Sequence, residues 1–348
     1  MKSIREAEIK GKTVLVRVDY NVPIKNGKIT DDLRIRASLP TLEFLREQGA
    51  KKIILISHLG RPEGYDKALS LKPIATALGK TLPDVGFVGE VSGPAVKDAV
   101  SKIKPGGILL LENLRFYPGE KENSEDFIRE IIEATGPDLY IQDGFAVLHR
   151  KHASVTAVQK CLPIYTGLLV EKELENLEKV IKNPVRPLLF IIGGAKVEDK
   201  TPYIEEFAKF ADYVIVGGKI AADGYKADDP KIYVAEDFDE DAGGAKLDVG
   251  PVSTIKMAEL IEKSKTIVWN GLLGKAEDPA YSTASNIVAE LLGQSSDKQT
   301  VICGGDTTGF VDHLMQENPE LHYSLVSTGG GASLEFMKNY SHGDIFVL

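Results

Sequence analysis

Two kinds of anion-binding residues are distributed unevenly along this chain of 348 residues. Nine of its ten arginines fall within the first 150 residues, whereas the glycine pairs that follow apolar, strand-like runs fall mainly in the second half. A guanidinium binds two oxygens of a phosphate or carboxylate at once, and glycine-rich turns before helices present backbone N–H groups to phosphate. The distribution predicts two anion sites of different chemistry, which an enzyme needs to move a phosphoryl group between two anionic substrates.

Polar residues follow four successive apolar runs of the first half. They are Asp19 and Asn21 after TVLVRV, His58 and Arg61 after KIILIS, Arg115 after GILLLE, and Arg150 after LYIQD, and Arg34 begins a predicted helix. One such arginine alone is more often an exposed surface residue. Because ligands of open parallel sheets bind beyond the carboxyl ends of the strands, the joint placement predicts one shared anion site.

Other basic residues of this half are not assigned to the shared anion site. Arg36, Arg46 and Arg129 lie within helical stretches and are interpreted as surface residues. His149 and His152 have a spacing that suits a metal pair, but no third ligand accompanies them, so anion contact or packing is favoured.

The second half contains five turns of small residues, each between an apolar run and a predicted helix. The turns are Gly193-Gly194-Ala195-Lys196 before Lys200, Gly217-Gly218, Asn270-Gly271, Gly304-Gly305-Asp306-Thr307, and 327–333. One such turn is explained by tight packing alone, whereas five predict a phosphate site. Asp306 is either a Mg²⁺ anchor or a helix cap. Neither a P-loop nor a G-x-G-x-x-G motif is present, which argues against an ordinary dinucleotide enzyme.

These turns require a regular framework of strands and helices. Apolar runs alternate with amphipathic stretches from TVLVRV to LYIQD, and again from PLLFII through YVIV, KIYVAEDF, TIVW and TVIC to SLV. This alternation is typical of α/β proteins with helices on both faces of a parallel sheet. We predict two doubly wound lobes. Residues 1–162 form the first, 163–183 a connecting helix and 184–330 the second, and 331–348 form a C-terminal segment that returns to the first lobe.

The composition of the chain restricts its binding partners and the cellular compartment in which it is expected to work. With 43% hydrophobic and 27% charged residues the chain is a folded protein, and a formal charge of -9 argues against a nucleic-acid binder. The first residues lack the apolar core of a signal peptide, and no stretch is long enough to span a membrane. Cys161 and Cys303 alone do not make a disulfide framework. We expect a cytoplasmic monomer that acts on small molecules, without a nucleic-acid or membrane partner.

Read in order, RVDYNVP, HLGRP, ENLRF, HRKHAS, GGAKVEDK, WNG, GGDT and STGGGASLE resemble the motif series of the phosphoglycerate kinase family, from Val14 to Glu335. The resemblance implies reversible phosphoryl transfer between 1,3-bisphosphoglycerate and ADP, giving 3-phosphoglycerate and MgATP in glycolysis and gluconeogenesis. It also implies two Rossmann-like lobes that move closer when both substrates are bound, with flexing around the connecting helix.

The resemblance also implies roles for individual residues. Substrate binding falls to Asp19, Asn21, Arg34, His58, Arg61, Arg115 and Arg150. Nucleotide binding falls to Gly193, Gly194, Lys196, Lys200, Gly217, Gly218, Asn270, Glu277, Gly304, Gly305, Asp306 and Thr307. Catalysis falls to Arg34, Lys196, Gly304 and Gly305, with Mg²⁺ on Asp306 and ATP or ADP as co-substrate.

One departure from the family pattern concerns the nucleotide base. The stretch from Gly218 to Pro251 is shorter than is usual in the family, and Lys246 stands where a small residue is usual. The shortening predicts that the base is less buried. An alternative therefore stays open, in which the chain is a catalytically weak protein that binds nucleotide or phosphometabolite and retains the fold. A scaffold is the least favoured interpretation, since it has no use for polar groups at strand ends.

Overall fold

The structure is a computed structural model that describes residues 2–195 and 197–341. It divides into two compact units, of which the first ends at Lys172 and the second begins at Glu173. The division falls inside helix α6 (Leu168–Lys182), which lies within the predicted connecting segment. Helix α12 (Gly331–Ser341) belongs to the second unit. The segment predicted to return to the first unit is 331–348, and its residues 342–348 lie outside the described residues, so the return stays a prediction.

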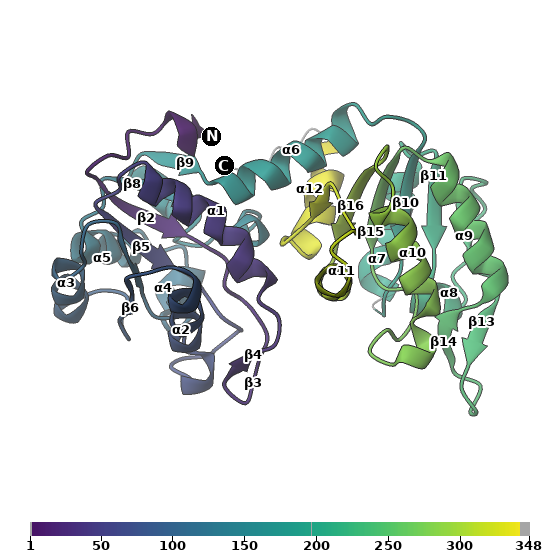
Figure 1. The fold of residues 1–348 in the computed structure, drawn as a ribbon, viewed down its shortest axis with the longest axis horizontal. Helices are drawn as coiled ribbons and strands as arrows, with labels where there is room; N and C mark the ends of the chain where they lie inside the picture. The colour runs from purple at the N-terminus through teal and green to yellow at the C-terminus, as the bar shows by residue number, and fades with distance from the viewer. Residues whose placement is uncertain (1, 196, 342–348) are drawn as a thin grey trace. The chain divides into compact units, whose positions relative to one another are not determined.

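The first unit is built around a seven-stranded parallel sheet (Figure 1). In spatial order its strands are β1 (Lys2–Ser3), β9 (Ile164–Thr166), β8 (Leu139–Gln142), β2 (Thr13–Arg17), β5 (Lys52–Ile56), β7 (Gly107–Leu110) and β6 (Val85–Phe87). The central strand β2 is buried along its whole length. A continuous apolar run of this kind is expected where helices cover both faces of a sheet.

Two separate hydrophobic clusters lie on the two faces of this sheet. The helices of the unit are α1 (Leu33–Glu47), α2 (Lys72–Thr81), α3 (Pro94–Ser101), α4 (Pro118–Lys121) and α5 (Glu125–Thr135). Val16 of β2 packs with Leu42 of α1 and Ile74 of α2. Its neighbour Leu15 belongs to the other cluster, with Ile128 of α5. Successive side chains of a strand point to opposite faces, so the sheet lies between two helical layers.

Helix α5 shows how local sequence sets the ends of these elements. The Ser124 hydroxyl accepts a hydrogen bond from the Phe127 N–H, and Glu125 and Asp126 occupy the first turn. A hydroxyl cap and acidic residues both stabilise a helix start. The helix ends at Gly136, whose φ of 57° lies in the left-handed region that glycine adopts readily.

The second unit has a six-stranded parallel sheet of its own. In spatial order its strands are β12 (Ile232–Val234), β11 (Tyr213–Val216), β10 (Leu188–Ile192), β15 (Thr266–Asn270), β16 (Gln299–Cys303) and β17 (Leu325–Val326). The two sheets confirm the predicted fold class. Within the ranges described, no helix has the length and apolar character needed to cross a membrane.

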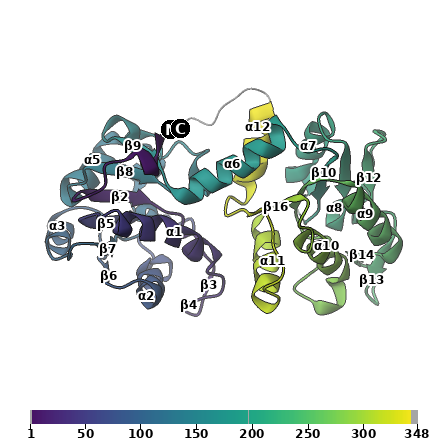
Figure 2. The same ribbon diagram turned by 45° about the horizontal axis from the view of Figure 1, so that its top comes forward.

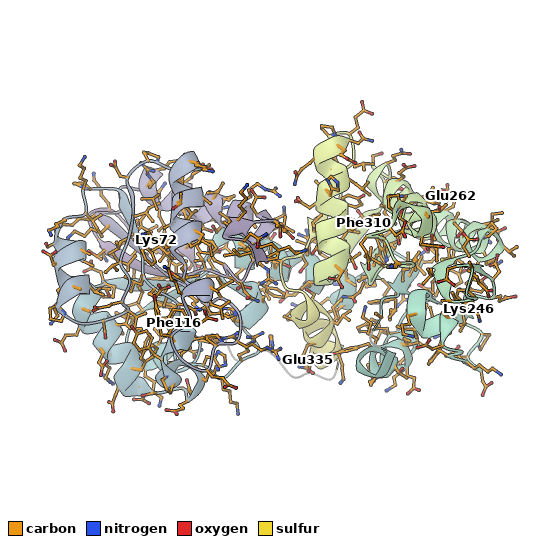
Figure 3. The ribbon with its side chains drawn as sticks, turned by 90° about the horizontal axis from the view of Figure 1, so that it is seen from below. Lys72, Phe116, Lys246, Glu262, Phe310 and Glu335 are labelled. Carbon is orange, nitrogen blue, oxygen red and sulfur yellow. The ribbon has the colours of Figure 1, made fainter. Side chains whose placement is uncertain are left out.

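Helices cover both faces of this second sheet as well. They are α7 (Val197–Ala208), α8 (Gly218–Ala222), α9 (Pro251–Lys263), α10 (Thr283–Gly293), α11 (Gly305–Glu317) and α12. Helices α9 and α10 lie side by side on one face (Figures 1 and 2). Phe190 of β10 stacks on Phe207 of α7, with ring centroids 4.3 Å apart. Glu335 of α12, labelled in Figure 3, accepts a hydrogen bond from the Tyr203 hydroxyl of α7 at 2.7 Å.

The shortened stretch after Gly218 differs from the single strand that KIYVAEDF suggests. The chain forms β12 first and then a separate antiparallel hairpin, β13 (Phe238–Glu240) with β14 (Lys246–Val249). The residues between β12 and β13 leave the sheet, because the Asp237 carboxylate accepts hydrogen bonds from the Val252 and Ser253 N–H groups at the start of α9. Capping of α9 therefore interrupts the strand. In the hairpin, the Lys246 ammonium lies over the Phe238 ring, 4.7 Å from its centroid.

Candidate active site

The structure places the predicted residues of the first unit at one edge of its sheet. Asp19 and Asn21 follow β2, His58 and Arg61 follow β5, Arg115 lies in the 3-10 turn Leu114–Phe116 after β7, Arg150 follows the 3-10 turn Phe145–Val147 after β8, and Arg34 lies in the first turn of α1. Strands β8, β2, β5 and β7 are consecutive neighbours in a parallel sheet. Their carboxyl ends are therefore adjacent, where ligands of such sheets bind.

Hydrogen bonds join most of these residues into one network. Nη1 of Arg34 donates to Oδ2 of Asp19 at 2.8 Å and to the carbonyl of Asn21 at 3.0 Å. The Asn21 side-chain oxygen accepts from the Gly60 N–H at 2.8 Å, and Nη1 of Arg115 donates to the Gly60 carbonyl at 2.6 Å. Two guanidinium groups from different elements are thus held in place by backbone and carboxylate groups. Such preorganisation is what anion recognition requires.

The positive charge of this network is crowded and partly desolvated. Arg115 is only 7% exposed. Burial, with the neighbouring charges of Arg150 and Arg17, lowers its pKa to about 10. Burial also lowers the pKa of Arg150. Within the described part of the chain, the buried Nε of Arg115 has no hydrogen-bond partner. Arg61 is exposed. An anion that neutralises these charges and accepts from the unpaired donor would be bound favourably.

Arg17 is a site-adjacent residue to which the sequence assigned no role, because it lies inside an apolar run. It is 0% exposed. Its Nε donates to the Ser154 hydroxyl at 2.9 Å, Nη1 donates to the Val18 carbonyl, and Nη2 lies 3.0 Å from Nδ1 of His58. An arginine within a strand buried on both faces is rare unless it is paired. The position of Arg17 inside a predicted buried strand was therefore the feature of the sequence that could have identified it.

The second unit brings most of its predicted residues to neighbouring strand ends. Gly193 and Gly194 follow β10, Gly217 and Gly218 lie at the junction of β11 and α8, Asn270 ends β15, and Gly304, Gly305, Asp306 and Thr307 lie at the junction of β16 and α11. Strands β11, β10, β15 and β16 are consecutive neighbours. Lys200 lies in the first turn of α7. Lys196 lies outside the described residues.

Close packing of backbone against backbone requires glycine at some of these positions. A Cβ at Gly193 would lie 2.5 Å from the Leu272 carbonyl oxygen, and a Cβ at Gly271 would lie 2.1 Å from the Gly193 oxygen. The two turns therefore pack backbone against backbone, and side chains are excluded. Nζ of Lys200 binds this junction, because it donates to the carbonyls of Gly193 at 2.7 Å and Asn270 at 3.3 Å.

The start of α11 is open by contrast. A Cβ at Gly305 would meet nothing within 4 Å, and Asp306 is exposed. Gly304 precedes the helix with a φ of 92°, and the Thr307 hydroxyl accepts from the Gly271 N–H at 2.8 Å. The first N–H groups of a helix have no partner within the helix and carry the positive end of its dipole. This end of α11 can therefore accept an anion.

Lys200 and Asp306 interact electrostatically. Burial lowers the pKa of the Lys200 ammonium to about 8, and the negative charge of Asp306 opposes that shift. The lysine is therefore positively charged at neutral pH, at the edge of its titration range. A phosphate bound at the start of α11 would favour the charged form.

Glu277 lies apart from these turns in sequence and is exposed. It belongs to the loop 271–281, which is tied to β14 because the Lys275 N–H donates to the Leu247 carbonyl at 2.8 Å. Asp248, which the sequence did not single out, holds the same loop. A Cβ at Gly274 would lie 2.2 Å from its Oδ1, and its Oδ2 accepts from the Ala284 N–H of α10 at 3.1 Å.

One doubly wound unit carries a guanidinium cluster, and the other carries an ammonium and an open helix start. Two anion sites of this kind are what a two-unit phosphotransferase requires. Comparison with known proteins gives the same class. A sequence model of the phosphoglycerate kinase family matches residues 4–241 and 223–339. The crystal structure of phosphoglycerate kinase from Pyrococcus horikoshii OT3 is similar over 97% of this chain and 96% of that one, with 27% identity and a TM-score of 0.87.

The structure of phosphoglycerate kinase from Coxiella burnetii is similar over 97% of this chain and 95% of that one, with 32% identity and a TM-score of 0.75. The chain belongs to the phosphoglycerate kinase family. It is a kinase that transfers a phosphoryl group reversibly between 1,3-bisphosphoglycerate and ADP in glycolysis, with the nucleotide as co-substrate. None of these findings favours the alternative of a catalytically weak binding protein.

Proposed function

We propose that the strand-end residues of the first unit bind 3-phosphoglycerate. These residues are Asp19, Asn21, Arg34, His58, Arg61, Arg115 and Arg150. The observation that carries the assignment is the hydrogen-bond network that joins the ends of β2, β5 and β7 to Arg34, in which the buried Nε of Arg115 is left without a partner among the described residues. An orphaned buried donor beside several guanidinium groups suits a phosphate or carboxylate oxygen. We assign Arg34 the further role of stabilising charge on the transferring phosphoryl group.

The second unit is proposed to bind the nucleotide phosphates. The residues are Gly193, Gly194, Lys200, Gly217, Gly218, Asn270, Gly304, Gly305, Asp306 and Thr307, with Glu277 on the ribose and Lys196 from outside the described residues. The open helix start and the Lys200 ammonium support this assignment. Backbone N–H groups of Gly304 and Gly305 and the two lysines would stabilise the phosphoryl group during transfer. In such reactions the protein forms no covalent bond to the substrate and acts by positioning and charge stabilisation.

The proposed ion is Mg²⁺, held by Asp306. Within the described residues, no group of three or more His, Cys, Asp or Glu side chains could hold a metal. A single exposed carboxylate beside an anion-binding helix start fits an ion that arrives with its nucleotide, because Mg²⁺ is commonly bound through one or two carboxylates and substrate phosphates. When bound, Mg²⁺ neutralises charge on the phosphate oxygens.

Binding measurements on two variants test the division of labour between the units. We expect Arg61→Ala to weaken 3-phosphoglycerate binding about 10- to 100-fold and to leave MgADP binding unchanged, since one charged contact is worth about 1.5–3 kcal/mol. Asp306→Ala is expected to weaken MgADP and spare 3-phosphoglycerate. Titration calorimetry of each variant with each ligand measures both effects.

Exposed residues of the same type provide matched controls. Arg129 of α5 pairs only loosely with Glu125, at 3.9 Å, and Asp297 pairs with Lys265. Arg129→Ala and Asp297→Ala remove the same charges from the same two units and should bind both ligands normally. Equal losses for both ligands in both test variants would show that the assignment of one ligand to each unit is wrong.

The proposal also covers the compartment, oligomeric state and partners of the enzyme. We infer a cytoplasmic monomer that acts on small molecules without a nucleic-acid or membrane partner. The free thiols Cys161 and Cys303 and the formal charge of -9 support this inference.

A further inference from the structure

We propose that Arg17, Ser154 and Glu120 form a positioning relay that holds His58 as its neutral Nε2–H tautomer, so that the imidazole donates one hydrogen bond to the bound sugar acid. The proposal rests on the anion site proposed for the first unit. It adds what that site leaves open, namely which nitrogen of His58 carries the proton and which residues decide it.

The contact between Arg17 and His58 determines the tautomer. Nη2 of Arg17 lies 3.0 Å from Nδ1 of His58. A guanidinium has donors and no acceptor, so Nδ1 must be the acceptor in this hydrogen bond and cannot carry a proton. The competing partner of Nδ1 is Oδ1 of Asp19, which would require Nδ1–H, but it is 3.6 Å away. That distance is too long for a hydrogen bond. The proton of the neutral ring therefore resides on Nε2.

Arg17 is itself held by a directional chain of hydrogen bonds. Its Nε donates to the Ser154 hydroxyl at 2.9 Å, and that hydroxyl donates to Oε1 of Glu120 at 2.6 Å. Oε2 of Glu120 accepts from the Ser154 N–H at 3.0 Å. Ser154 has one hydroxyl proton, which it gives to the carboxylate, so its oxygen is free to accept from Arg17. The chain thus fixes one end of the guanidinium fork while the other end faces His58.

Burial makes this relay rigid. Arg17 and Glu120 are both 0% exposed, and Ser154 is also fully buried. A buried charge without a partner is strongly unfavourable, so each member is confined to the geometry that satisfies the others. Arg17 lies on β2, Glu120 on α4 and Ser154 beyond the 3-10 turn after β8. The relay therefore joins three separate parts of the unit to the strand end that carries His58.

The second nitrogen of His58 is the one to which a ligand oxygen would have to bind. His58 is 1% exposed, and its Nε2 is buried without a hydrogen-bond partner in the part of the chain that the structure describes. The charged groups that act on the ring are Arg17 on β2, Asp19 after β2, Arg34 on α1, Arg115 after β7 and Arg150 after β8. Burial, followed by the four arginines, lowers the pKa of His58 well below 6.5.

The tautomer decides whether Nε2 attracts or repels an oxygen of a bound anion. With the proton on Nε2, the ring donates toward an oxygen of the ligand. With the proton on Nδ1, Nε2 would present a lone pair to a carboxylate or phosphate oxygen, which repels it. A charged imidazolium would add one more positive group to four arginines. The relay thus supplies a donor without adding charge.

Nitrogen NMR of the histidine rings in the full-length, ligand-free chain tests the proposal directly. His58→Gln assigns the His58 signals. We expect a neutral ring with the proton on Nε2, unchanged between pH 6 and 8. In Ser154→Ala, Nε of Arg17 loses its acceptor, while Nη1 keeps the Val18 carbonyl, and we expect the His58 signals to move toward a mixture of the two tautomers. We also expect KM for 3-phosphoglycerate to rise about tenfold while KM for MgATP stays constant.

Ser70→Ala is the matched control. The Ser70 hydroxyl also donates to a buried glutamate of this unit, Oε2 of Glu112, at 2.7 Å, but does not contact Arg17. It should leave the His58 signals and both KM values unchanged. Arg17→Lys is a second test variant that keeps the charge and cannot hold Ser154 and His58 at once, and it should mix the tautomers as Ser154→Ala does.

Several outcomes would overturn the relay. A wild-type His58 that is protonated on Nδ1 at pH 7 contradicts it whatever the variants do, as do unchanged His58 signals in both Ser154→Ala and Arg17→Lys. The proposed substrate site fails separately, if His58→Gln binds 3-phosphoglycerate as the wild type does. The ring signals are recorded without substrate, so the two failures can be told apart.

Discussion

Lys200 is a partly buried ammonium at the point where two turns of the second unit meet. Its Nζ donates to the carbonyls of Gly193 and Asn270, and burial lowers its pKa to about 8. Below that pH the side chain carries a charge that a nucleotide phosphate can use, and above it the charge is lost. This residue should therefore give the free enzyme a titration in the alkaline range.

We predict that kcat/KM for MgATP is nearly constant below pH 7 and declines through a single ionisation with its midpoint near pH 8. The parameter kcat/KM reports groups of the free enzyme, so a steady-state pH profile measures it. In Lys200→Arg the charge persists, because a guanidinium stays protonated in this range, and the decline above pH 8 should disappear.

Lys209→Arg provides the control for this pH profile. Lys209 is exposed and pairs with Glu206 at 2.6 Å, so its replacement should keep the wild-type profile. An alkaline decline that persists in Lys200→Arg would assign the ionisation to another group.

At the scale of elements, the loop 271–281 depends on a carboxylate outside it. Asp248 is 2% exposed, a Cβ at Gly274 would lie 2.2 Å from its Oδ1, and its Oδ2 accepts from the Ala284 N–H at the start of α10. Burial raises the pKa of Asp248. The same loop carries Glu277, the proposed ribose ligand. The position of that ligand should therefore respond to a change in Asp248.

We predict that Asp248→Ala raises KM for MgATP about tenfold and leaves KM for 3-phosphoglycerate unchanged. Loss of a helix-capping carboxylate also costs about 0.5–2 kcal/mol of stability. Steady-state kinetics and denaturant unfolding measure the two effects.

The matched control for Asp248 is Asp237→Ala. Asp237 is also a carboxylate that accepts at a helix start, from the Val252 and Ser253 N–H groups, but within the described part of the chain no hydrogen bond joins it to the loop. It should lose similar stability and keep both KM values. If both variants raise KM for MgATP equally, the effect reflects general destabilisation of the unit, and Asp248 has no positioning role.

At the scale of the whole molecule, each compact unit carries one of the two proposed anion sites. Transfer of a phosphoryl group requires the attacking and leaving oxygens in line at reacting distance, with water excluded. We therefore predict that 3-phosphoglycerate and MgADP together reduce the radius of gyration, and that neither ligand alone does so to the same extent. Small-angle scattering of the free, singly bound and doubly bound enzyme measures this change. An unchanged radius in an enzyme shown to be active would contradict closure.

Much of the framework could be predicted from local sequence. Alternating apolar runs and amphipathic stretches determine two doubly wound sheets, since strand and helix periodicity are local properties. The position of Asp19, His58, Arg115 and Arg150 just after such runs follows from the same pattern. So does Asp306 beside a glycine turn at a helix start. The sequence therefore determined which residues reach the carboxyl edges of the sheets.

The tertiary structure decided what surrounds those residues. Arg17 meets His58 across 41 positions and Ser154 across 137 positions of the chain, so no local pattern could indicate their contact. The role of Gly193 was equally hidden, because the atom that excludes a side chain there is the carbonyl oxygen of Leu272 on another turn. The restraint of the Glu277 loop by Asp248 depends on three segments meeting in space. Tautomers, shifted pKa values and close backbone contacts arise from long-range packing, which only the folded chain determines.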